Sequence, residues 1–221
     1  MKLHVLVEGP SEEAWLRPWL RRFLPPHTCH IIPHQGKGKL ARNFAVPVDE
    51  KQRGLLDQLP AKLRVYGRAL NSSTDRVVVL VDADAQDCVD LKKRITDCVA
   101  ACVPPPIVLV RIAVEESEAF FLGDTAAMKA AFGKLKTAKL NTYQQDSVCG
   151  TWEIFRDVIG VSVGSEDKVG WAETIAPHLS LDPKKNKSPS FRILCSGLKV
   201  LAGDMHAHQL RTGAKNSRKV H

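Results

Sequence analysis

With 221 residues, of which 44% are hydrophobic, the chain can form one large core, or one core with a small helical annex. No stretch approaches the roughly 18 uninterrupted apolar residues of a membrane-spanning helix, and the N-terminus lacks the ordered regions of a signal peptide, so we expect a cytoplasmic protein without a membrane segment. The 32 lysines and arginines outnumber the 24 acidic residues, and the net charge of +8 favours a polyanionic partner such as nucleic acid.

Four apolar runs are predicted as β-strands. Three of them are rich in Val, Leu and Ile, as strands covered on both faces are, and the second in chain order is weaker. They comprise residues 2–7, 27–34, 76–81 and 106–114. The segments between them have the apolar spacing of helices. Such an alternation predicts an α/β fold with a mainly parallel sheet flanked by helices.

The helices expected between the strands are residues 11–24, 49–70 and 87–103. Ser11 is the expected N-cap of the first helix, and Pro18 and Pro60 are expected to interrupt the first and the second. Cys98 and Cys102 share one face of the third. Because the six cysteines of the chain form no CxxC pair, we interpret them as reduced, mostly buried thiols and not as zinc ligands.

From about Phe120 the pattern changes to short helices joined by polar loops, without a further convincing strand. These helices are expected at residues 121–133, 151–160, 167–179 and 190–203, with residues 134–150 as a mobile connection. We therefore predict an α/β core at residues 1–124 and a helical C-terminal extension packed on it at residues 125–205. Residues 206–221 form a basic tail that we expect to be disordered.

Acidic residues follow three of the four predicted strands. The first strand leads to Glu8, the third to Asp82 and Asp84, and the last to Glu115, Glu116 and Glu118. The carboxyl ends of parallel strands meet at one edge of a sheet, where ligands bind. Carboxylates gathered there repel one another unless a cation neutralises them, and hard oxygen ligands suit Mg²⁺ or Mn²⁺.

The pair Asp82 and Asp84 also has a purely structural interpretation. A single DxD at the end of a strand is more often a turn or a helix cap than a metal site. If the strand continued through Ala83, however, both carboxylates would point the same way and could face one metal. Three acidic strand ends at one edge favour the metal site.

The sequence resembles the Toprim domain of topoisomerases, DnaG-type primases and OLD nucleases, which have a Glu-Gly pair after the first strand and DxD after a later one. More closely, it resembles the uncharacterised bacterial Toprim-like family DUF4276. The segments that match in order are VEGPSEE, HQGKGKL, RVVVLVDADAQDC, RIAVEESEAFFLGD and NKSPSF. One departure is Phe120, which stands where that family usually has tryptophan. The resemblance implies a Toprim-like, Rossmann-like fold over most of the chain.

The resemblance also implies roles for the acids. Glu8 would be a metal ligand or the general base, and Asp82 and Asp84 would hold Mg²⁺ or Mn²⁺. Glu116 and Glu118 would complete the acidic set, Glu118 being the better candidate for a catalytic role.

Two further acids have open interpretations. Glu115 is expected to lie on a solvated face. Glu12, four residues after Glu8, could be a further metal ligand facing the same site from the first turn of the helix, but capping of that helix is an equal interpretation.

Two basic elements could contact backbone phosphates. In HQGKGKLAR, phosphate contact through Lys37 or Lys39 competes with an ordinary exposed loop, because the GKS or GKT ending of a Walker motif is absent. In the second element, Lys187, Ser188 and Ser190 open the last helix, whose N-terminal amides could bind an anion. Ser190 as a simple N-cap is an equal interpretation.

The chemistry that fits these residues is metal-assisted hydrolysis of a phosphodiester, with DNA favoured over RNA as substrate. A topoisomerase mechanism is disfavoured, since neither Tyr66 nor Tyr143 lies in a recognisable strand-passage domain. Any ATP dependence would have to come from a separately encoded ATPase, plausibly in bacterial defence or repair, because the chain has no Walker motif. The alternatives are a non-catalytic module that binds nucleic acid or protein, and a primase or nucleotidyl transferase, for which no template-binding domain is recognisable.

Overall fold

The four predicted strands form one parallel sheet. The computed structural model describes residues 1–47, 49, 51–147, 150–162, 164 and 167–203, so the predicted tail at 206–221 lies outside the described residues. The strands are β1 (Lys2–Val7), β2 (Thr28–Pro33), β3 (Asp75–Asp82) and β4 (Val108–Ala113). Their order is β2-β1-β3-β4, and every neighbouring pair is parallel, which confirms the predicted α/β class.

The helices between the strands are α1 (Pro10–Phe23), α2 (Leu55–Ala69) and α3 (Cys88–Ala100). Two details differ from the sequence prediction. The N-cap of α1 is Gly9 and not Ser11, with Pro10 in the first turn, where its missing N–H is not needed. Pro18 and Pro60 lie inside α1 and α2 without ending them, because burial of the apolar face outweighs the lost backbone hydrogen bond.

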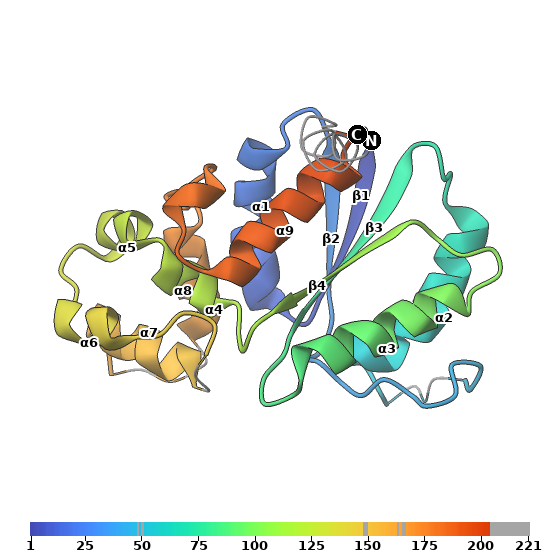
Figure 1. Cartoon of the computed structure of the whole chain (residues 1–221), viewed down its shortest axis with the longest axis horizontal. Coiled ribbons are helices and arrows are strands. Elements are labelled where there is room, and N and C mark those ends of the chain that lie inside the picture. The colour runs from blue at the N-terminus through green and yellow to red at the C-terminus, as the bar shows by residue number, and fades with distance from the viewer. Residues whose placement is uncertain (48, 50, 148–149, 163, 165–166, 204–221) are drawn as a thin grey trace, which may run out of the picture.

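Both faces of the sheet are buried, which explains why its strands are apolar along their length. Val78 and Leu80 of β3 pack toward α1, and Val77, Val79 and Val81 pack toward α2 and α3. Figure 1 shows α1 and α9 (Pro189–Leu201) on one side of the sheet and α2 and α3 on the other. Cys98 of α3 and Cys102, two residues after its end, are buried free thiols within this second layer, as predicted.

The C-terminal part is helical, and the described residues contain no further strand. Its helices before α9 are α4 (Glu118–Gly123), α5 (Thr125–Phe132), α6 (Thr137–Thr142), α7 (Thr151–Ile159) and α8 (Lys168–Ile175), followed by the short 3-10 helix η2 (Pro183–Lys185). Helix α6 lies in the segment that was expected to be a mobile connection.

An aromatic cluster joins the C-terminal helices to the first layer of the sheet. Trp15 of α1 meets Phe120 edge-on at 5.8 Å between ring centroids, and Trp19 contacts Phe191 of α9 at 5.4 Å. All four rings are fully buried. This shared core fixes the C-terminal helices beside the edge of the sheet where β1, β3 and β4 end. No helix of the described chain is long and apolar enough to cross a membrane.

Candidate functional site

The acidic residues gather at the carboxyl edge of the sheet, next to the point where the strand order changes direction. β1 lies at the centre, with β2 on one side and β3 on the other, so the connections leave β1 in opposite directions. Ligands of open α/β sheets bind at such a switch point. Here the last residue of β3 is Asp82, and Glu8 directly follows β1.

Glu8 is fixed by the backbone of the neighbouring strand. Its Oε1 accepts a hydrogen bond of 2.8 Å from the Asp82 N–H, and its carbonyl accepts one of 2.8 Å from the Gly36 N–H. Burial raises the pKa of Glu8 to about 8, and the charges of Glu12 and Asp84 act in the same direction. The Asp82 N–H and the Lys37 ammonium oppose the increase without cancelling it. Glu8 is therefore a carboxyl group in a set orientation with a strongly raised pKa.

Glu12 belongs to the same site. It is buried, and its Oε1 accepts hydrogen bonds from the hydroxyls of Ser11 at 2.9 Å and Ser117 at 3.1 Å. Helix α1 has no side-chain cap, and Glu12 lies in its first turn, where its charge also favours the helix dipole, so both interpretations of Glu12 stay open. Ser117 precedes α4 and thereby links the first helix to the acids after β4.

Asp82 lies at the centre of the acidic cluster. It is buried, and within the described residues its carboxylate accepts no hydrogen bond and forms no ion pair. Burial raises its pKa well above the usual value, and the charges of four neighbouring carboxylates raise it further. These neighbours are Glu8, Glu12, Glu118 and Glu116. The structure thus brings together five acids from two strand ends, helix α1, the segment after β4 and the start of helix α4.

Asp84 stands at the rim of this cluster. The strand ends at Asp82, and Asp84 has a left-handed backbone with φ of 48°, so the two carboxylates do not project from a continuing strand. The exposed carboxylate of Asp84 accepts a bond of 2.8 Å from the Lys37 Nζ, which also donates to the Ala83 carbonyl at 2.9 Å. Lys37 is mostly covered and sits inside the candidate site, beside Glu8.

The acids after β4 are held by the C-terminal helices. Glu116 accepts a hydrogen bond of 2.9 Å from the Trp152 N–H, and Lys168 lies 3.4 Å from Glu116 and 3.3 Å from Glu118. Burial raises the pKa of Glu118 to about 7, although Lys168 opposes the increase.

Glu115 was expected on a solvated face. That expectation is wrong, since Glu115 is buried and accepts a hydrogen bond from the Thr151 hydroxyl.

Lys168 is the residue of this site that sequence reasoning missed. It begins α8, fifty residues after Glu118, and its ammonium lies over the Trp152 ring at 5.6 Å from the centroid. Burial disfavours the charged form, but the carboxylates of Glu118 and Glu116, helped by Asp82, outweigh it and raise the pKa of Lys168. No periodicity or motif marks this lysine in the sequence, because only the packing of α8 on α1 brings it to the edge.

Unlike Lys37, the predicted phosphate contacts Lys39 and Lys187 are not part of the acidic cluster. Lys39 is exposed and borders a groove of about 790 Å³ that Arg42 and Arg94 also line. Lys187 is likewise exposed.

The two serines that open α9 are already bound to a carboxylate. The Ser188 hydroxyl donates to Asp146 at 2.8 Å, and the Ser190 N–H donates to the same group at 2.7 Å. Ser188, and not Ser190, is the N-cap of α9. A phosphate at this helix end would have to replace Asp146.

Comparison with known proteins identifies the family. The model of a domain of unknown function, DUF4276, matches residues 7–199, which include every acid of the cluster and Lys168. The chain belongs to this family. Among solved structures, the DUF4276 chain is similar to the C-terminal region of the Burkholderia pseudomallei OLD protein, with 14% identity and a TM-score of 0.49 over 90% of this chain and 98% of that one. A likeness at this level says nothing about activity. No curated protein matches the sequence.

Proposed function

We propose that this protein is a Mg²⁺- or Mn²⁺-dependent phosphodiesterase that cleaves nucleic acid, with DNA the preferred substrate. The observation that carries the proposal is the convergence of Glu8, Glu12, Asp82, Glu116 and Glu118 at the switch point of a parallel sheet. Buried acids that raise one another's pKa are costly to a fold and mark functional sites more often than structural ones.

The side chains of the cluster fit a hard divalent cation. All of them offer carboxylate oxygens, the ligands that Mg²⁺ and Mn²⁺ prefer, and Asp82 is buried without a donor in the described chain. No three of the described His, Cys, Asp or Glu side chains already stand in ligating positions, so binding needs side-chain rotations. We assign the ligand role to Glu8 and Asp82, with Glu12 and Asp84 as further ligands, and Glu116 and Glu118 would join them only on leaving the Trp152 N–H and Lys168.

The protein's own groups have distinct roles in the proposed hydrolysis. A bound divalent ion polarises a phosphoryl oxygen and lowers the pKa of a water molecule. As the alternative to binding the metal, Glu8 would take the proton of the attacking water, for which the Asp82 N–H holds its carboxylate in a set orientation. Lys37 presents an ammonium group beside Glu8 and neutralises part of the charge of the phosphate. Lys168 offsets the charge of Glu116 and Glu118.

Exposed cations can hold the remainder of the substrate. Lys39 and Lys187 contact backbone phosphates, and the net charge of +8 favours such contacts through release of counterions. Ser188 and Ser190 take part only if a phosphate displaces Asp146. Any requirement for ATP is met by a separately encoded ATPase.

The test is cleavage of plasmid DNA and labelled RNA by the purified protein, with and without MnCl₂. We expect DNA to be cut only with metal, and the metal to raise the melting temperature, since a ligand at 100 times its Kd stabilises by about 2.7 kcal/mol. Asp82→Asn combined with Asp84→Asn should abolish both effects. Asp90→Asn, at an exposed acid of α3, should leave both intact. Metal stabilisation that persists in the double variant would rule out the assigned site.

A second candidate is a non-catalytic module that binds nucleic acid or protein. It is favoured by the contacts of Glu115 and Glu116 with Thr151 and Trp152, because these tie the acids to α7 in a structural role. Under this hypothesis the wild type shows the metal-induced stabilisation but cuts neither DNA nor RNA.

A further inference from the structure

The fourth strand leaves one edge of the sheet open. In the described part of the chain β4 pairs with β3 alone. The carbonyls of Ile107 and Ala113 accept bonds from Val77 and Ala83, so alternate residues of this segment face β3. Since successive residues of a strand point their backbone groups to opposite sides, Val108, Val110 and Ile112 direct theirs to the open edge.

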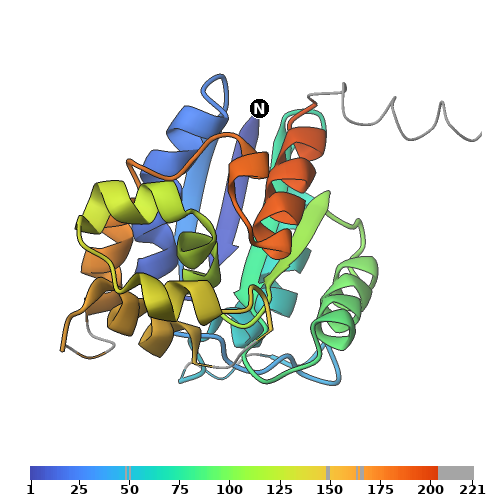
Figure 2. The same ribbon diagram turned by 60° about the vertical axis from the view of Figure 1, so that its left-hand side comes forward.

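A groove runs along this edge between two helices. Both ribbon views show α3 and α9 on either side of β4 (Figures 1 and 2), and residues of both helices line the groove. The groove has a volume of about 400 Å³ and is lined chiefly by apolar side chains, among them Val89 of α3, Ile193 of α9, and Val110 and Ile112 of β4. Val89 is 73% exposed and Ile193 is 55% exposed. Apolar residues that meet across an open strand edge form a site for another chain.

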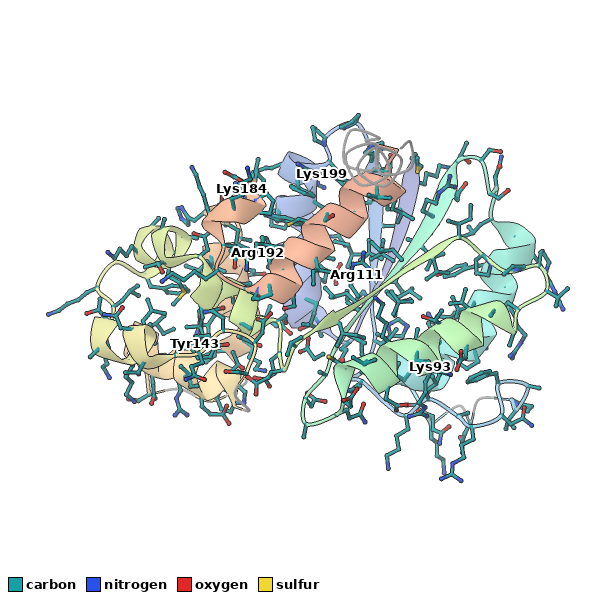
Figure 3. The ribbon with its side chains drawn as sticks, viewed as in Figure 1. Lys93, Arg111, Tyr143, Lys184, Arg192 and Lys199 are labelled. Carbon is teal, nitrogen blue, oxygen red and sulfur yellow. The ribbon has the colours of Figure 1, made fainter. Side chains whose placement is uncertain are left out.

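The groove also holds a cation without an acidic partner. Arg111 of β4 reaches α9 (Figure 3), where its Nε donates to the Ile193 carbonyl at 3.1 Å, and its Nη1 donates to the Val110 carbonyl at 2.8 Å. Its guanidinium packs so closely on Gly197 that a Cβ there would lie 2.3 Å from Nη2. Among the described residues Arg111 forms no ion pair. Lys92 adds a second positive charge to the lining, and Asp146 adds one negative charge, whose carboxylate is already bound by Ser188 and Ser190.

We propose that this groove binds an extended segment of a partner protein, which adds as a strand to β4 and places a carboxylate against Arg111. The outward backbone groups of β4, apart from the Val110 carbonyl that Arg111 already occupies, supply the pairing, and consecutive apolar side chains of the segment face Val89 on one side and Ile193 on the other. The cation Arg111 selects an acidic residue among them.

Charge and lining decide between this occupant and the other candidates. A second copy of the chain would bring Arg111 and Lys92 of both copies together in a protein that already carries a net charge of +8, so it is disfavoured. A nucleic acid would match the cations but not the apolar walls. The opposite edge of the sheet offers less, since β2 exposes Thr28 and His30 and ends at Pro33.

The probe is a phage-displayed library of random peptides of about a dozen residues, selected on the full chain. We expect enriched peptides to combine a run of β-branched residues with Asp or Glu. When such a peptide is synthesised, its affinity measured by fluorescence anisotropy should fall about tenfold or more for the double variant Val89→Asp with Ile193→Asp, because two apolar contacts are lost. N-methylation of alternate backbone amides of the peptide should abolish binding.

The control is Val65→Asp, which changes a valine that is 59% exposed on α2 and should leave the affinity unchanged. Equal melting temperatures verify that the variants fold. The proposal is overturned if no peptide is enriched, or if the enriched peptides bind the double variant or their N-methylated forms equally well. It is also overturned if the double substitution instead weakens binding of single-stranded DNA, or converts a wild-type dimer to a monomer.

Discussion

Acids at the same edge of the sheet have opposite surroundings. Those after β4 are held by the protein itself: Glu115 by Thr151, Glu116 by the Trp152 N–H, and Glu118 by Lys168. Asp82, at the end of β3, is buried with no donor to its carboxylate in the described chain, and Glu8 has one backbone N–H. The acids after β4 thus already have donors or a counter-charge within the protein. Glu8 and Asp82, at the same edge of the sheet, have a single backbone N–H between them.

The difference separates two uses of a buried acid. A carboxylate with a built-in partner holds elements together, as those after β4 fasten α7 and α8 to the sheet. A buried carboxylate without such a partner lowers the stability of the fold unless a cation from solution binds to it. We therefore expect substitutions at Glu8 to change activity and substitutions at Lys168 to change stability.

The largest expected effect is that of Glu8→Gln. The amide keeps an oxygen that can accept the Asp82 N–H bond, so the fold and nucleic-acid binding should persist. It cannot take a proton, and the rate of metal-dependent cleavage should fall roughly 100-fold or more, as is typical for a lost general base. Plasmid cleavage measured with purified protein checks this.

The matched control for that variant is Glu13→Gln on α1, since Glu13 pairs with Arg17 outside the cluster. Its cleavage rate should equal that of the wild type. Cleavage retained by folded Glu8→Gln protein would refute the catalytic role.

A smaller effect is expected from Lys168→Met. Removing this ammonium leaves Glu116 and Glu118 without their counter-charge, and we expect a loss of about 2 kcal/mol in the free energy of unfolding, between the values for exposed and fully buried pairs. Lys93→Met removes the exposed pair with Asp97 on α3 (Figure 3) and should cost no more than about 0.5 kcal/mol. Urea unfolding measures both. Equal losses would mean that the charge of Glu118 is balanced in another way.

A further effect concerns pH. Burial raises the pKa of Glu8 to about 8 and that of Glu118 to about 7, from 4.5. The folded state thus keeps protons that the unfolded chain releases, so the stability contributed by these groups is complete below about pH 4.5 and is lost as the pH rises to about 8. The melting temperature of metal-free protein should fall over this range, and less so for Glu8→Gln. A melting temperature that rises instead would contradict the assignment.

The fold and the location of the acids were predictable because their signals are local. Apolar runs along β1, β3 and β4 mark strands buried on both faces, and a parallel sheet brings their ends to one edge. Glu8 and Asp82 therefore meet for topological reasons that the sequence already contains. The match to DUF4276 confirms the family that the ordered motifs indicated.

The neutralising partners could not be predicted, since they arrive by tertiary packing. Lys168, which neutralises Glu118, lies in a segment without a motif and is 50 residues away from it. Asp146, which binds Ser188 across more than 40 residues, is likewise unmarked in the sequence although it neutralises no charge. Asp84 has a left-handed backbone, so the chain turns there. The expectation that Asp82 and Asp84 point the same way required a continuing strand, and it therefore does not apply. Helices α1 and α2 continue through Pro18 and Pro60 because packing overrides local propensity.

The hydrogen bond from the Asp82 N–H to Glu8 also constrains the order of events in folding. The two residues are 74 positions apart, and β2 and α2 must be traversed before β3 can lie beside β1. Contacts of such long sequence separation form late, because the entropy of closing the loop is lost before the contact compensates it. A chain that has formed only β1, α1 and β2 holds Glu8 without its amide and without Asp82. Such an intermediate lacks Asp82 at the candidate site, so under the proposed function a polypeptide still in synthesis cannot cut nucleic acid before its third strand is in place.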